Sequence, residues 1–112
     1  MPDKESKETD EKISQLQILE QNLQGFLLQK QSLHTQLLEV DSALLELGKT
    51  DTAYKIVGNI MVKTRKDALQ KDLNEKKEII NLKMKSIERQ ENKIKESMQS
   101  TQKEVLDSMK MK

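Results

Sequence analysis

Apolar residues recur every three or four positions along the first half of the chain. Alternating steps of three and four from Leu16 to Leu47 reach ten positions, and nine of them are apolar. A spacing sustained in this way is typical of a coiled-coil seam, because it keeps one narrow stripe facing a partner helix. It predicts a first coiled-coil helix over residues 13–47. Six further apolar residues are expected to broaden the stripe: Ile13, Ile18, Leu27, Leu28, Leu38 and Leu45.

A second seam runs through the last part of the chain with more interruptions. Seven of the ten positions counted from Leu73 to Val105 are apolar, and the exceptions are Lys77, Glu91 and Thr101. The pattern predicts a second coiled-coil helix over residues 66–108, held mainly by its better-patterned partner. Thr64 and Asp67 have the spacing of a capping box, in which Thr64 would accept a hydrogen bond from the first turn.

The segment between the two helices, residues 48–65, follows a different period. It opens on Gly48, which is expected to adopt the left-handed conformation that ends many helices. Farther on, β-branched and aromatic residues flank Gly58 and Asn59, a pair typical of a two-residue hairpin loop. We therefore expect two short antiparallel strands in which Val57 lies opposite Ile60.

Two long helices joined by so short a connection should fold back on each other. The predicted fold is mainly α: a long antiparallel α-helical coiled-coil hairpin with one β-hairpin at the bend. In this register Leu16 lies near residues 98–101. The charged N-terminal residues 1–12 and the C-terminal residues 109–112 are expected to be flexible tips.

An isolated two-stranded hairpin is marginally stable in water, and its strand edges carry unpaired backbone groups. Pairing with hairpins of other subunits in a shared sheet or closed barrel would satisfy those edges and bury both faces. A hairpin that merely capped its own helices would leave much apolar strand uncovered. The predicted oligomer interface consists of Tyr54, Ile56, Val57, Gly58, Ile60, Met61 and Val62.

Composition argues against catalysis. The chain has no cysteine, which removes disulfides and thiolate chemistry, and His34 is its one histidine. A Ser-His-Asp arrangement would need that residue on a helix pair without a pocket, and the three glycines are too dispersed for a phosphate loop. We expect no catalytic residue, no bound metal and no cofactor.

Charge and hydropathy limit the partners. The net charge of +1 provides no field to attract nucleic acid or an anionic membrane. No apolar run approaches the ~18 residues that cross a bilayer, and the charged N-terminus lacks the apolar core of a signal peptide. We expect a soluble, cytoplasmic protein that binds neither nucleic acid nor membrane.

The Tyr-Lys-Ile-Val-Gly-Asn-Ile-Met-Val-Lys run at residues 54–63, between two long helical arms, resembles archaeal-like β-type subunits of the prefoldin family. The resemblance covers about residues 13–105, and the single hairpin points to the β class because α-class subunits carry two. It implies a hexameric chaperone of two α-type and four β-type subunits. Such a complex holds unfolded polypeptides at its coiled-coil tips without ATP and delivers them to a group II chaperonin.

In that interpretation, client capture is hydrophobic burial at the free ends of the helices. Methionine suits such a surface because its flexible thioether adapts to many shapes. The expected client-binding residues are Ile13, Leu16, Met98, Val105, Leu106, Met109 and Met111. For Met98, simple filling of the coil is an equally good interpretation. A different class of function also fits the helices, namely a structural coiled-coil adaptor that tethers two specific proteins, but it leaves the hairpin unexplained.

Overall fold

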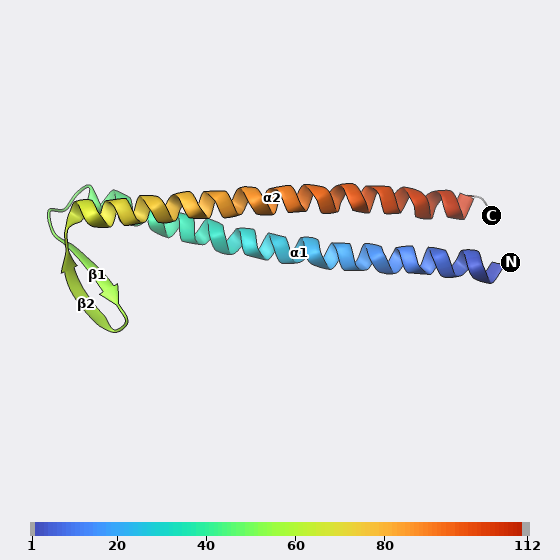
Figure 1. Cartoon of the computed structure of the whole chain (residues 1–112), viewed down its shortest axis with the longest axis horizontal. Coiled ribbons are helices and arrows are strands. Elements are labelled where there is room, and N and C mark those ends of the chain that lie inside the picture. The colour runs from blue at the N-terminus through green and yellow to red at the C-terminus, as the bar shows by residue number, and fades with distance from the viewer. Residues whose placement is uncertain (1, 111–112) are drawn as a thin grey trace. The chain divides into compact units, whose positions relative to one another are not determined.

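A computed structural model describes the backbone of residues 2–110 and the side chains of residues 7–110. Its elements are the helix α1 (Pro2–Leu47), the strands β1 (Ala53–Val57) and β2 (Ile60–Thr64), and the helix α2 (Lys66–Lys110) (Figure 1). The chain divides into two compact units, each containing part of both helices. The terminal unit comprises the described residues up to Gln29 and from Ser86 onward, and the hairpin unit comprises Lys30–Lys85.

Two long helices and an antiparallel β-hairpin confirm the predicted fold class. The helix α1 starts at Pro2, which is earlier than the apolar 3-4 pattern predicts. Proline is tolerated at the first helical position, where its missing N–H would have no intrahelical partner. The helix thus includes most of residues 1–12, and the flexibility expected of this segment and of residues 109–112 in solution stays a prediction.

Both predicted seams face the interior of the helix pair. All twenty counted positions, ten on each helix, are buried or half-buried. The most buried ones are Leu33, Val40 and Leu47 on α1, and Ile80, Ile87 and Glu91 on α2, which are 3% to 9% exposed. The seam is therefore where the two helices pack, as the 3-4 spacing predicts.

The six extra apolar residues of α1 do not widen this buried stripe. Each is at least 41% exposed, and Leu28 reaches 67%. With one partner helix on one side, positions outside the 3-4 pattern point away from the contact and stay in water.

Within each unit the two helices run side by side in opposite directions (Figure 1). In the hairpin unit, the Lys77 Nζ lies 2.8 Å from the Asp41 Oδ1, which gives this polar seam position a partner on α1. In the terminal unit, Leu19 lines one groove together with Ser97 and Thr101. These neighbours agree with the register that places Leu16 near residues 98–101.

The strands pair in the predicted register, with Val57 opposite Ile60 and Ile56 opposite Met61. Gly58 has a φ of +61°, whereas Asn59 has a negative φ. A positive φ at the first loop position alone is the pattern of a type II′ turn, which suits the twist of a hairpin. Glycine reaches this conformation without a Cβ clash.

The end of α1 differs from the expectation. Gly48 does not have a positive φ, so the predicted left-handed ending was wrong. Its N–H donates to the Leu44 carbonyl at 3.2 Å, and the next two N–H groups, of Lys49 and Thr50, donate to the carbonyls of Glu46 and Leu47. Successive three-residue bonds tighten the chain after the helix and satisfy its last carbonyls without an unusual φ.

The start of α2 is also shifted from the predicted cap. Thr64 is the last residue of β2, and the Arg65 carbonyl accepts the N–H of Leu69 at 3.0 Å, which makes Arg65 the capping residue. Asp67 lies in the first turn as expected, where its Oδ1 accepts the N–H of Ala68 at 3.0 Å. A carboxylate here suits the positive end of the helix dipole.

Burial of the seam predicts a contrast between two apolar residues of α2. Ile80 is 3% exposed and Leu82 is 57% exposed. Ile80→Ala should lower the free energy of unfolding by about 2 to 5 kcal/mol, because it removes buried methyl groups and leaves a cavity. Leu82→Ala should change it by no more than about 0.5 kcal/mol. Denaturant titration followed by circular dichroism measures both, and equal losses would contradict the packing described.

Candidate interaction surfaces

The β-hairpin exposes apolar side chains on both of its faces. Alternation along the strands places Tyr54, Ile56 and Met61 on one face and Val57, Ile60 and Val62 on the other. Their exposed fractions run from 46% for Val62 to 70% for Ile56. Gly58, at the tip, is exposed as well. All seven residues of the predicted interface therefore lie together on one uncovered ribbon.

The hairpin is attached to its own helices only at its root. Ala53, at the start of β1, is 4% exposed, and Thr64, opposite it on β2, is half-buried. The eight other strand residues are exposed. Because the sheet has two strands, each strand also has one edge without a neighbour. The hairpin thus leaves both apolar faces and both edges available to another chain.

The predicted client-binding residues fall into two groups within the terminal unit. Ile13, Leu106 and Met109 are exposed, at 41%, 56% and 60%. Leu16, Met98 and Val105 occupy seam positions and are half-buried. Met111 lies outside the described residues. The first group is open to solvent, and the second contributes to the contact between the helices.

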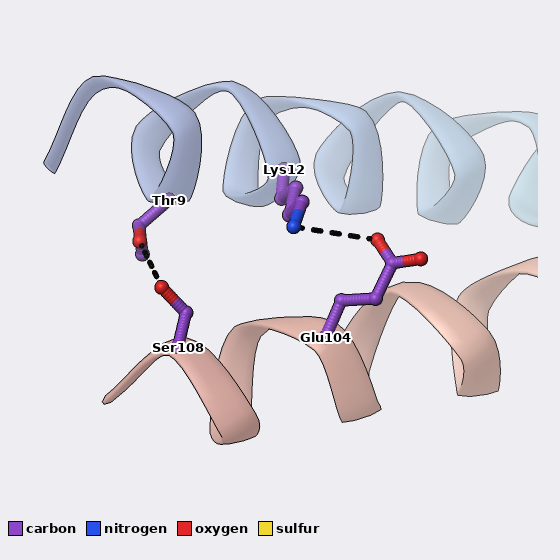
Figure 2. A network of polar contacts seen from close by, with 4 residues as sticks. All are labelled: Thr9, Lys12, Glu104 and Ser108. Carbon is purple, nitrogen blue, oxygen red and sulfur yellow. Dashed lines mark hydrogen bonds and ion pairs between the residues drawn. The ribbon is translucent and has the colours of Figure 1, made fainter. Parts of the chain in front are cut away.

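Polar side chains connect α1 to α2 near the ends of the helices (Figure 2). The hydroxyl oxygens of Thr9 and Ser108 are hydrogen-bonded at 3.0 Å. One turn farther along α1, the Lys12 Nζ lies 3.6 Å from the Glu104 Oε2. These contacts were not predicted, although extending the 3-4 count upstream from Leu16 reaches Lys12 and Thr9. The same count extended beyond Val105 reaches Ser108.

The described part of the chain contains no group of three or more His, Cys, Asp or Glu residues placed to hold a metal ion. His34 is exposed. Among the described helices, none combines the length and apolarity that crossing a membrane requires. Exposed apolar side chains occur instead on the hairpin, in the terminal unit and along the outer faces of both helices.

The chain is similar to known proteins over most of its length. Residues 10–111 match a family model described as a prefoldin subunit. The chain is 41% identical to the prefoldin subunit beta of Archaeoglobus fulgidus over 93 residues, which is 80% of each chain. It is 37% identical to that of Sulfurisphaera tokodaii over 101 residues, or 88% of this chain and 81% of the relative. The crystal structure of the prefoldin beta subunit from Thermococcus strain KS-1 superimposes with a TM-score of 0.84 at 32% identity, covering 90% of this chain and 91% of that one.

Proposed function

This chain belongs to the prefoldin family of chaperone subunits, which are not enzymes, and we propose that it serves as a β-type subunit that holds unfolded polypeptides without ATP. Membership of the family implies assembly with other prefoldin subunits. The proposed complex contains two α-type and four β-type subunits, works in the cytoplasm and passes its clients to a group II chaperonin.

The exposed hairpin is the observation that supports assembly most strongly. Contact with a similar ribbon would stabilise an apolar ribbon that has two open faces and two open edges, because the contact would bury apolar side chains and pair backbone groups together. Hairpins that join into a closed barrel would cover both features at once. We therefore assign Tyr54, Ile56, Val57, Gly58, Ile60, Met61 and Val62 to the interface between subunits.

The exposed apolar residues of the terminal unit support client binding. Burying one side chain such as Ile13, Leu106 or Met109 contributes only ~1.5 to 3 kcal/mol, so a single subunit would bind an unfolded chain weakly. Several subunits in one complex would raise the effective concentration and hold the client firmly. Each individual contact stays weak, which allows release without nucleotide hydrolysis.

A nucleotide-free aggregation assay tests this function. The complex reconstituted with an α-type subunit should suppress light scattering by a protein diluted from denaturant, and added ATP should not change the result. Deletion of residues 103–112 should weaken suppression while the complex persists, because Leu106 and Met109 are lost and the hairpin is intact. If the truncated complex protects the client as well as the full-length one, these residues are not the binding surface.

The aggregation assay also tests the alternative function, a structural adaptor. An adaptor would bind particular folded proteins and would not protect unrelated unfolded ones. A complex that fails to suppress aggregation of several unrelated clients would therefore contradict the chaperone function.

A further inference from the structure

We propose that Lys55 and Lys63 make the hairpin selective for a partner ribbon that carries carboxylates, and that the hairpin of an α-type subunit, rather than a second copy of this chain, is that partner. The inference rests on the proposed function as a β-type subunit. It adds the chemistry that determines which ribbon the hairpin binds, because burial of apolar side chains by itself does not distinguish one apolar ribbon from another.

Each face of the ribbon carries one lysine. Lys55 lies opposite Val62 on one face, and Lys63 lies opposite Tyr54 on the other. Both lysines are exposed, and they are the only charged residues of the two strands. The hairpin therefore presents a positive charge beside its apolar side chains on whichever face a partner binds.

These two lysines have no ionic partner among the side chains that the structure describes. Neither ammonium group forms an ion pair with any carboxylate of residues 7–110. The nearest acidic residues in the sequence, Asp51 and Asp67, lie outside both strands. Asp67 is already close to another cation, because its Oδ1 lies 3.7 Å from the Arg65 Nε. A carboxylate that pairs with Lys55 or Lys63 is therefore expected to come from another chain.

Closure of several ribbons into a barrel favours a partner of this kind. One face of every ribbon would line the interior of the barrel, and because each face carries a lysine, one lysine of every copy would lie on the inward face. Removing an ammonium group from water without an opposite charge destabilises an assembly. Copies of this chain alone would bring only like charges to that interior, whereas a ribbon with Asp or Glu would supply the opposite charge.

Edge-to-edge pairing of two identical ribbons leads to the same conflict. Lys55 is the central residue of β1 (Ala53–Val57), so two β1 strands paired antiparallel over their full length would place the two Lys55 side chains directly opposite each other. Like charges in that position destabilise a sheet, and opposite charges stabilise it. Lysines on exposed edge strands are also a common means of preventing unwanted strand pairing. A partner strand with a carboxylate at this position would replace the repulsion with attraction.

A charge swap between two copies of this chain tests the selectivity without any other subunit. The variant Lys55→Glu/Lys63→Glu carries on its ribbon the carboxylates that the proposal requires of a partner. Mixed with the wild-type chain, it should form a complex at least about tenfold tighter than either chain forms with itself, because each lysine meets carboxylates in place of lysines. Added salt should weaken the mixed complex. Analytical ultracentrifugation of each chain and of the mixture measures the affinities, and equal affinities in all three samples would overturn the inference.

Binding to an α-type subunit provides the second measurement. The hairpin variant should bind that subunit at least about tenfold more weakly than the wild-type chain does, because its carboxylates would face carboxylates. The control Lys76→Glu/Lys83→Glu makes the same charge change at exposed positions of α2 and should bind like the wild type. Unchanged binding by a hairpin variant that circular dichroism shows to be folded would overturn the selectivity. Failure of the wild-type chain itself to bind would instead contradict the proposed function.

Discussion

Replacing Ile56 and Met61 with aspartate is expected to abolish assembly of the complex while leaving the chain folded. The two residues are paired across the hairpin and are 70% and 65% exposed in the single chain. Aspartate is therefore well solvated before assembly. In a subunit interface the same carboxylates would be buried without partners, at a cost of several kcal/mol each. Size-exclusion chromatography should show the variant separate from its partner subunits, and circular dichroism should show the helices of the wild-type chain.

A matched control tests whether the position of the two added charges, and not their number, prevents assembly. Ile79 and Leu82 on α2 are 51% and 57% exposed, so Ile79→Asp/Leu82→Asp adds the same two charges at exposed apolar positions outside the hairpin. This control should assemble normally. Assembly of the hairpin variant at the wild-type level would show that the exposed ribbon is not the interface.

The sequence predicted the helix seam well, because the side-chain spacing itself defines which face of a helix meets its partner. All positions counted from Leu16 and from Leu73 are buried or half-buried. The hairpin register was also predictable, since a two-residue loop at Gly58 and Asn59 leaves one pairing of the flanking residues. These features depend on local geometry, which a single sequence contains.

The apolar character of a residue predicted its burial less well than the 3-4 spacing did. Leu28, Leu38 and Leu45 were expected to join the stripe, but they are 67%, 55% and 63% exposed. An apolar side chain favours burial, but its presence in the sequence does not show which partner will cover it. The apolar residues of the hairpin are exposed in the single chain as expected, and their burial by another chain stays a prediction.

Helix ends were the least predictable part, because several arrangements satisfy the same backbone groups at similar cost. Gly48 closes α1 without a positive φ, and Arg65 caps α2 in place of Thr64. The contacts of Thr9 with Ser108 and of Lys12 with Glu104 were missed because the apolar count stopped at Leu16 and Val105. Carried on through polar residues, the same 3-4 spacing reaches Lys12, Thr9 and Ser108, which shows that the period continues after the apolar residues end.

Assembly through the hairpin is the central claim, and the native mass of the wild-type chain, measured with and without an α-type partner, tests it most directly. Each copy of this chain has a mass of 13.0 kDa. Mixed with the partner, the chain should appear in a hexamer whose mass corresponds to four copies of it and two of the α-type subunit. A monomer or a plain dimer in the presence of that partner would contradict the account.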